Sequence, residues 1–279
     1  MKEKQYDLCG THHWAVKLVC YLVFCFLLTP ICIVIITSIN PQPYLSFSLK
    51  EFSLTWYMQF FEDFRWRNSL WLSFYIALLT VCIAVPLGTM AAMATVRLRF
   101  FGKGSFEFLV LAPFLLPGLV LGIGLLIFMN FLEIRGSILS LILGHSILTL
   151  PVAYLSVRAV LIGVSTSIEE AAIGLGAGRI RTFFEITIPL ARPGILTACF
   201  FVFILSFNEF ILSLFLTTHR TITLPIRIWS SLQYEISPIV SATSTVLIIV
   251  SMVTLTVASL LSSIERLSRR EMVEETKNR

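Results

Sequence analysis

Six apolar segments, each long enough to cross a lipid bilayer as a helix, constrain the fold of this chain more than any other feature. They are expected at residues 18–38, 69–96, 107–132, 138–162, 193–217 and 240–263. An α-helix rises about 1.5 Å per residue, so about 20 apolar residues span the hydrocarbon core. Because lipid offers the backbone no hydrogen-bond partner, helices are favoured over open strands. The sequence therefore predicts an all-α, polytopic transmembrane helical protein with six spans, in which Pro113 and Pro117 allow a kink in the third.

The composition excludes several other classes of protein. Of the 279 residues, 57% are hydrophobic and 13% are charged, whereas soluble domains carry about 25% charged residues. The net charge is +5, but no basic block is interleaved with aromatic residues on a soluble domain, so we expect no nucleic acid partner. The six cysteines form no CxxC pair, and no cluster of metal ligands or nucleophile–base set is visible. We therefore expect neither a metal site nor catalytic residues.

The distribution of Lys and Arg predicts the orientation in the membrane. If the N-terminus is cytoplasmic, 15 of the 21 basic residues lie in or beside the cytoplasmic segments, as the positive-inside rule requires. We therefore divide the chain into a cytoplasmic N-terminus (1–17), a transmembrane domain (18–263) and a cytoplasmic tail (264–279). Residues 39–68 would be external, and their aromatic side chains favour a short helix at the membrane interface.

The loop between the fourth and fifth predicted spans carries more specific features than a simple connection needs. It reads SIEEAAIGLGAGRIRTFFEITIPLARPGI and runs from Ser167 to Ile195. Ser167 and Glu170 have the spacing of a capping box, and the negative charge of Glu169 also suits the first turn of a helix. We therefore expect a short helix that begins at Ser167.

Three glycines separate this helix from a second one. Gly174, Gly176 and Gly178 can adopt the positive φ angles that end a helix. The second helix is expected at 179–186, with Pro189 ending it. Two short helices held against the cytoplasmic face can enter a groove on another protein, and an ordinary pair of interfacial helices is the alternative.

The same loop resembles the EAA loop of ABC importer permeases. The family pattern is EAA, three residues, Gly, nine residues and then I-x-L-P, and it is matched by the segments 170–172 and 186–189 and by Gly176. Ile188 in place of Leu is the single departure and is conservative. The resemblance implies a fold like that of type I ABC importer permeases, in which coupling helices at 165–189 dock on a cytoplasmic ATPase, with Glu170 as the polar contact. The ATPase-coupling residues that it implies are Glu169, Glu170, Ala171, Ala172, Gly176, Ile186 and Pro189.

A second resemblance covers most of the chain. The segment Ser206–Ile248 and the order of the spans are similar to those of spermidine/putrescine permease subunits. This resemblance implies a multi-pass protein of the bacterial inner membrane that imports a polyamine. Its partners would be an ABC ATPase dimer, a second permease subunit (a heterodimer rather than a homodimer), an extracytoplasmic solute-binding protein and membrane lipids. The alternatives are another cargo, such as ferric iron, an opine or an amino acid derivative, and a secondary transporter driven by an ion gradient.

The chain has no GxxxxGK[ST] phosphate loop, so we do not expect it to be an enzyme. ATP and Mg would be used by the partner ATPase, and this chain would bind no cofactor. A closing ATPase dimer would draw the coupling helices together and switch the spans between inward-facing and outward-facing states.

Three polar residues within the predicted spans are candidates for a substrate pathway. Glu209 with its neighbour Asn208 in the fifth span, and His145 in the fourth, are expected at similar depths in the outer half of the membrane. An ionisable residue in hydrocarbon is costly unless it faces a cavity or a partner, and a carboxylate would favour a cationic solute. Alternatively, Glu209 pairs with a partner subunit or a neighbouring hydroxyl, and His145 makes an interhelical hydrogen bond.

Overall fold

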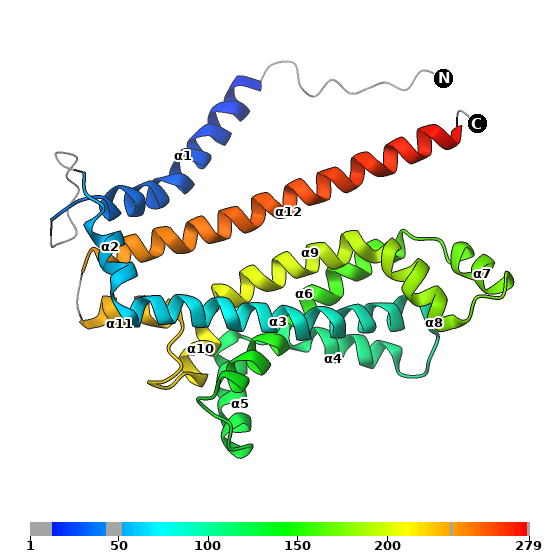
Figure 1. Ribbon diagram of the computed structural model, residues 1–279, viewed down its shortest axis with the longest axis horizontal. Helices are drawn as coiled ribbons and strands as arrows, with labels where there is room; N and C mark the ends of the chain where they lie inside the picture. Colours follow the sequence, from blue (N-terminus) through cyan, green and yellow to red (C-terminus); the bar gives the residue numbers. More distant parts are fainter. Residues whose placement is uncertain (1–12, 43–51, 235–236, 278–279) are drawn as a thin grey trace. The chain divides into compact units, whose positions relative to one another are not determined.

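The regular elements in the described part of the chain are all helices (Figure 1). The computed structural model describes residues 13–42, 52–234 and 237–277. The chain forms two compact units. Unit 1 comprises Met1–Glu62 and Ser231–Val246, and unit 2 comprises Asp63–Ser230 and Leu247–Arg279.

The number of described helices that could span a membrane matches the six predicted spans if one bent pair of helices forms one span. The elements are α1 (His13–Ser38), α2 (Thr55–Glu62), α3 (Phe64–Arg97), α4 (Lys103–Leu115), α5 (Gly118–Phe131), α6 (Ile138–Ile162), α7 (Ser167–Gly174), α8 (Arg179–Thr182), the π-helical turn η1 (Phe183–Thr187), α9 (Ile188–Phe207), α10 (Ile211–Leu216), α11 (Leu224–Tyr234) and α12 (Ile239–Lys277). Within the described residues, five helices are long and apolar enough to cross a membrane, and the bent pair α4–α5 can make a sixth span.

The third predicted span is not one continuous helix. α4 and α5 meet at an angle of 105°, at Leu116 and Pro117. Leu116 is extended (φ −81°, ψ 138°), because the ring of a proline disfavours the helical conformation of the residue before it. The kink that the prolines allow within the predicted span over 107–132 is therefore present, and it is a full break of the helix.

The fifth span lies earlier in the sequence than predicted. Helical structure continues from Arg179 to Phe207, through α8, η1 and α9. Residues 208–210 then interrupt the helix, and the short α10 follows. The prediction of a single helix over 193–217 is wrong, because that segment contains the end of one helix, a break and a second helix.

Pro189 does not end the second helix of the loop, contrary to the prediction. It lies in the first turn of α9, directly after η1. In η1 the N–H of Ile188 donates to the carbonyl of Phe183, five residues back. Because this wider turn already interrupts the regular pattern of bonds four residues apart, a residue without an N–H is accommodated there.

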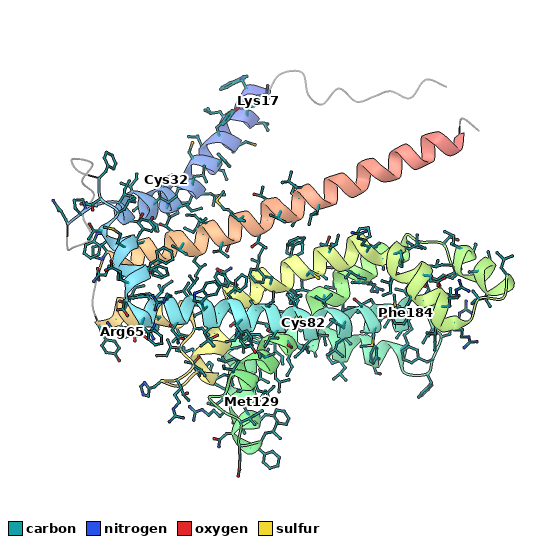
Figure 2. All side chains as sticks on the ribbon, in the orientation of Figure 1. Lys17, Cys32, Arg65, Cys82, Met129 and Phe184 are labelled. Carbon is teal, nitrogen blue, oxygen red and sulfur yellow. The ribbon has the colours of Figure 1, made fainter. Side chains whose placement is uncertain are left out.

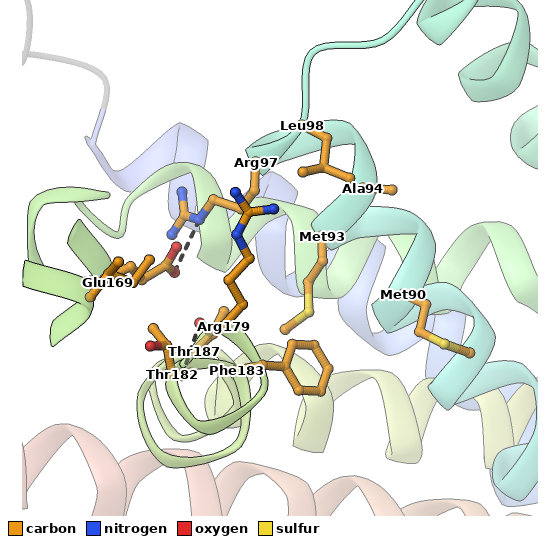
Figure 3. Close-up of a pocket in the computed structure, with 11 residues that line it drawn as sticks. Met90, Met93, Ala94, Arg97, Leu98, Glu169, Arg179, Thr182, Phe183 and Thr187 are labelled. Atoms are coloured by element: carbon orange, nitrogen blue, oxygen red, sulfur yellow. Dashed lines mark hydrogen bonds and ion pairs between the residues drawn. The ribbon is translucent and has the colours of Figure 1, made fainter. Parts of the chain in front are cut away.

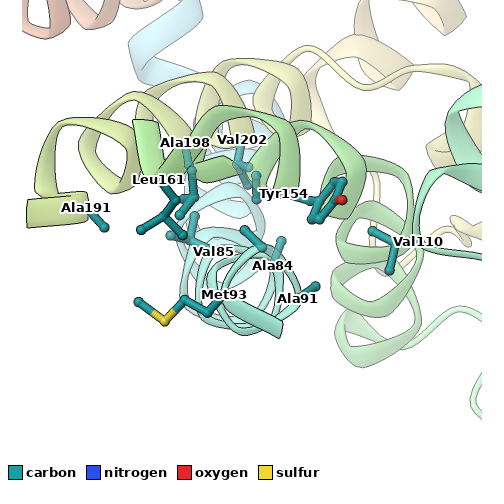
Figure 4. Packing of buried hydrophobic residues seen from close by; sticks show 13 residues of the cluster. Ala84, Val85, Ala91, Met93, Val110, Tyr154, Leu161, Ala191, Ala198 and Val202 are labelled. Carbon is teal, nitrogen blue, oxygen red and sulfur yellow. The ribbon is translucent and has the colours of Figure 1, made fainter. Parts of the chain in front are cut away.

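The core of unit 2 is built where α3, α6 and α9 come close together (Figure 4). Small side chains line this contact, and the buried members include Ala84, Ala91, Ala92, Ala153, Ala191 and Ala198. At Gly88 the approach is closest, since a Cβ placed there would lie 2.6 Å from the Cβ of Ala153. Small residues allow helix backbones to approach in this way, which is how helices associate in lipid.

Unit 1 is organised by polar contacts at the end of α1. The hydroxyls of Ser38 and Tyr57 share a hydrogen bond of 2.7 Å, and Trp56 Nε1 donates to the carbonyl of Asn40 at 2.7 Å. The helix predicted within 39–68 is therefore present as α2, and two of its aromatic side chains hold it to the end of α1. A location at the membrane interface remains a prediction.

The described cysteines are free thiols, and most of them lie on helix surfaces (Figure 2). Cys20, Cys25 and Cys32 are exposed on α1 and Cys82 is exposed on α3, while Cys199 on α9 is partly buried. On a membrane-spanning helix, such small apolar side chains can face lipid or another subunit.

Candidate functional site

The loop between α6 and α9 is folded as a helical hairpin, with α7 on one side and α8 with η1 on the other. Its first helix does not start with the predicted capping box. Thr166, which precedes α7, is already helical (φ −66°, ψ −20°) and makes no side-chain cap. The hydroxyl of Ser165 instead accepts the N–H of Ser167 at 3.2 Å. The prediction failed because the chain enters the helix one residue earlier, which leaves Ser167 inside α7.

The turn of the hairpin depends on Gly176, as predicted. α7 ends at Gly174, and Gly176 has a φ of +91°, in the region that favours glycine. No atom lies within 4 Å of the place where a Cβ of Gly176 would be, so its backbone conformation and not crowding requires glycine. Gly178 then precedes α8 with an extended backbone.

Glu169 points toward the spanning helices and away from the hairpin surface (Figure 3). Its Oε1 accepts a hydrogen bond from Nε of Arg97, the last residue of α3, at 3.1 Å. The side chain of Arg97 is only 13% exposed and that of Glu169 only 15%. Arg97 also donates through Nη1 to the carbonyl of Leu161 and through Nη2 to that of Val164, at 3.3 and 3.1 Å. Sequence reasoning missed this role of Arg97, because an arginine at the end of a span looks like an ordinary positive-inside charge.

The other predicted coupling residues divide by exposure. Glu170, Ala171, Gly176 and Pro189 are exposed, whereas Ala172 and Ile186 are half-buried. Beside them lie three large apolar side chains that the sequence analysis did not single out: Leu175 is 90% exposed, Ile180 77% and Phe184 64%. We call these three residues the apolar hairpin patch. The sequence signal that could have identified them is the apolar side chains on either side of the glycine turn, and exposed apolar side chains of this kind suit contact with another protein.

A cavity of about 490 Å³ separates the hairpin from the end of α3. Met90, Met93 and Leu98 line it from α3 and its last turn, and Ile173 and Phe183 line it from the hairpin. The ion pair between Glu169 and Arg97 lies in its wall. The hairpin is therefore not packed closely against α3 over its whole length (Figure 3).

Glu209 lies in the break between α9 and α10, where its carboxylate caps the short helix. Its Oε1 accepts the N–H of Leu212 at 2.7 Å, and the residue is half-buried. The neighbouring Asn208 donates through Nδ2 to the carbonyl of Ile204 at 2.9 Å and to the hydroxyl of Ser251 at 3.2 Å. Both residues therefore help to shape the break itself.

His145 is buried in a polar network between helices. Its Nδ1 is 2.8 Å from the hydroxyl of Ser206 on α9, and its Nε2 is 3.1 Å from that of Ser213 on α10. Ser206 in turn donates to the hydroxyl of Thr80 on α3 at 3.3 Å. The interhelical hydrogen bond that was the alternative to a substrate-pathway role for His145 is thus present. No hydrogen bond joins Glu209 to His145, but they bind the adjacent residues Leu212 and Ser213 at the start of α10.

The opposite end of α3 from Arg97 is capped by Asp63. Its Oδ1 accepts the N–H of Arg65 at 2.7 Å, and its Oδ2 pairs with the guanidinium of Arg65 at 2.9 Å. The hydrogen bond with the Arg65 side chain lowers the pKa of Asp63. Arg227 of α11 donates to the hydroxyl of Ser69 on α3 at 2.7 Å, and partial burial lowers the pKa of its guanidinium.

The described residues contain no group of three or more His, Cys, Asp or Glu side chains that could hold a metal ion. Asp63 and Glu209 instead cap helices, Glu169 pairs with Arg97, and His145 makes hydrogen bonds between helices. The arrangement is that of a helical membrane domain with a partly exposed helical hairpin between α6 and α9.

Comparisons with known sequences point in the same direction. Residues 84–271 match the family described as binding-protein-dependent transport system inner membrane component. The putrescine transport system permease protein PotI of Escherichia coli (strain K12) is 31% identical over 236 residues, which cover 81% of this chain and 83% of PotI. The spermidine/putrescine transport system permease protein PotC of Haemophilus influenzae is 28% identical over 242 residues, which cover 87% of this chain and 94% of PotC.

Solved structures of ABC transporters share the fold. A bacterial ABC transporter involved in the import of the acidic polysaccharide alginate matches with a TM-score of 0.71 at 15% identity, covering 90% of this chain and 94% of that chain. The MetNI methionine ABC transporter, in inward-facing conformations, matches with a TM-score of 0.55 at 14% identity, covering 71% of this chain and 94% of that chain. With the sequence match over most of its length, the chain belongs to the binding-protein-dependent transport system inner membrane component family, the permease subunits of ABC importers.

Proposed function

We propose that this chain is a permease subunit of an ATP-driven importer for polyamines, which are small organic cations. The observation that carries the proposal is the similarity to PotI, named for putrescine transport, at 31% identity over 81% of this chain. The similarity to PotC, named for spermidine and putrescine, covers 87% of the chain. Both matches reach well beyond the coupling loop, so they do not depend on a motif that importers of many solutes share.

Separate ATPase subunits would drive the transporter, because this sequence has no phosphate-binding loop. The exposed face of the hairpin supports a docking role. It combines the small residues Ala171 and Gly176 with the carboxylate of Glu170 and the apolar hairpin patch. Such a surface can enter a groove on a partner, and we place the ATPase contact there. Both termini of the chain would then be cytoplasmic.

A second permease chain and an external binding protein would complete the assembly. Apolar side chains on α1 and α5 are exposed in this chain, among them Phe26 (77%) and Phe131 (80%). Lipid and a second permease, in our proposal a different chain, would cover such surfaces. The alginate transporter has also been solved in complex with an alginate pentasaccharide-bound periplasmic protein, and we propose a binding protein for this transporter too.

Glu209 would meet the cationic cargo. None of the ion pairs among the described residues involves Glu209, so no cation of this part of the chain neutralises it. It lies at a helix break, half-buried, and an unneutralised carboxylate in such a place attracts an ammonium group. Asn208 would line the same pathway. His145, whose two ring nitrogens are both engaged by serines, would contribute by holding α10 in position.

Transport by the complete assembly tests the proposed function. The chain is reconstituted in proteoliposomes with its second permease, its ATPase and its binding protein, and uptake of labelled putrescine and spermidine is measured. We expect uptake that requires both ATP and the binding protein. Uptake of ferric iron or an amino acid derivative in place of polyamines would refute the cargo. Uptake by this chain alone, driven by an ion gradient, would refute the ATP-driven mechanism.

Glu209→Gln tests the pathway residue. Gln keeps an oxygen that can accept the N–H of Leu212, so α10 stays capped while the negative charge is lost. We expect polyamine uptake to fall about tenfold, as the loss of a charge-assisted hydrogen bond predicts. Glu133→Gln removes an exposed carboxylate elsewhere and serves as the control. Equal uptake by the two variants would exclude Glu209 from the pathway.

A further inference from the structure

We propose that Arg97 is a positioning residue that joins the coupling hairpin to the ends of α3 and α6, so that these three elements move as one body. This inference rests on the proposed function, because it concerns how motion of an ATPase reaches the spans. One side chain would transmit this motion, because it bridges three helices. Arg97 is the last residue of α3, and it binds Glu169 in α7. It also binds the carbonyl of Leu161, near the end of α6, and that of Val164, just after α6.

The first helix of the hairpin, α7, has few other means of attachment to the spanning helices. α7 contains no buried residue, so it contributes nothing to the hydrophobic core. The cavity of about 490 Å³ lies between the hairpin and the last turns of α3. Among the ion pairs of the described residues, the one between Arg97 and Glu169 alone connects α7 to a spanning helix. A force applied to α7 therefore has a direct path to α3 through this side chain, beside the path through α8, η1 and α9.

The geometry uses the shape of the guanidinium group. Nε binds Glu169, while Nη1 and Nη2 each bind a carbonyl, so three donors of the planar fork act in different directions. The carbonyls of Leu161 and Val164 lie where α6 ends, at the negative pole of the helix, and there a cation is favourable. A lysine carries the same charge but has no planar fork, and it cannot reproduce the three directions together.

Burial distinguishes this ion pair from an ordinary surface pair. The side chains of Arg97 and Glu169 are 13% and 15% exposed, whereas those of the neighbouring pair Arg181 and Glu185 are 70% and 60% exposed. Exposed pairs are screened by water and contribute little. A pair that is mostly shielded and also bound to backbone carbonyls resists separation far more strongly.

The first experiment measures coupling in the reconstituted transporter. Arg97→Gln removes the ion pair, and Arg99→Gln is the matched control, since it removes the same charge from an exposed side chain two residues away. The readout is the number of ATP molecules hydrolysed per polyamine imported. We expect this ratio to rise about tenfold in the Arg97→Gln transporter, because the direct path from α7 to α3 is lost, and to stay unchanged in the control. Arg97→Lys should give an intermediate ratio. Equal ratios for Arg97→Gln and Arg99→Gln would overturn the proposal.

The second experiment does not depend on the cargo. Hydrogen exchange of residues 165–175 is followed by mass spectrometry in the purified transporter. We expect exchange about tenfold faster in the Arg97→Gln transporter than in the Arg99→Gln control. Glu169→Gln, which leaves the two carbonyl bonds of Arg97 intact, should show a smaller increase. Unchanged exchange in both Arg97→Gln and Glu169→Gln would overturn the proposal, even if polyamine transport is established. Faster exchange in a transporter that does not import polyamines would support the attachment and refute only the cargo.

Discussion

The close approach of α3 and α6 at Gly88 makes a sharp test of the packing. In Gly88→Ala the new Cβ would lie 2.6 Å from the Cβ of Ala153 and 2.8 Å from the backbone nitrogen of Tyr154. Ordinary carbon contacts are about 3.5–4.0 Å, so α3 and α6 would have to separate by about 1 Å. Neither neighbouring atom belongs to a flexible side chain, so the strain cannot be relieved by a change of rotamer. Overpacking of this kind costs about 1–3 kcal/mol.

A matched control isolates that cost. Gly124→Ala, on α5, also places alanine within a helix, but nothing lies within 4 Å of its new Cβ. Both variants receive the same gain in helix propensity, so the difference between them is the cost of the close contact. The free energy of unfolding is measured in mixed micelles of detergent and SDS. We expect Gly88→Ala to be less stable than Gly124→Ala by about 1–3 kcal/mol.

A second substitution shows whether the cause is steric. Ala153→Gly in the Gly88→Ala background removes the nearest atom, but the nitrogen of Tyr154 remains too close. The double variant should therefore recover only part of the lost stability. Stabilities of Gly88→Ala and Gly124→Ala within about 0.5 kcal/mol of each other, the usual scatter of surface substitutions, would refute the reasoning.

Two further substitutions test local backbone and capping features. Gly176→Ala forces a side chain onto a residue with a φ of +91°, which costs about 1–2 kcal/mol. The amount of ATPase that co-purifies with the transporter should fall about tenfold, whereas the control Gly104→Ala, which has open space around the new Cβ, should leave it unchanged. An unchanged amount in Gly176→Ala would contradict a role for this turn. Asp63→Ala removes the cap of α3 and should lower the free energy of unfolding by about 1 kcal/mol at neutral pH. In the folded chain the hydrogen bond with Arg65 lowers the pKa of Asp63 below its usual value of 3.8. The stabilisation by this cap is therefore present above pH 3.8 and is lost as the pH falls further. A difference in free energy of unfolding between the unsubstituted chain and Asp63→Ala that grows on acidification would contradict this role of Asp63.

Local patterns were enough to predict many of the helices. α6 begins and ends at the predicted residues 138 and 162, and the hairpin turn has its positive φ at Gly176. Apolar length and glycine position act through the membrane thickness and through the backbone of a few residues, so both can be recognised in sequence. The resemblance of residues 170–189 to the EAA loop could be recognised for the same reason, since the motif lies in one stretch of the sequence.

Hydropathy did not predict where a span breaks. Leu116 and residues 208–210 lie within apolar runs, yet the helices end there. Transfer of a side chain into lipid depends on its polarity and not on the direction of the backbone, so a broken helix and a straight one have the same hydropathy profile. Pro189 was misjudged for a related reason, because the π turn that accommodates it is defined by hydrogen bonds and leaves no signal in composition.

The sequence by itself determined that this is a helical membrane protein of the importer permease family, with a pair of short helices between its fourth and fifth spans. Only the tertiary structure decided what its charged residues do. Arg97 and Glu169 are 72 residues apart in the chain and meet because α3 ends beside α7. Glu209 caps α10 because the helix breaks just before it. Such pairings depend on where separate helices come together, and neither residue type nor local spacing contains that information.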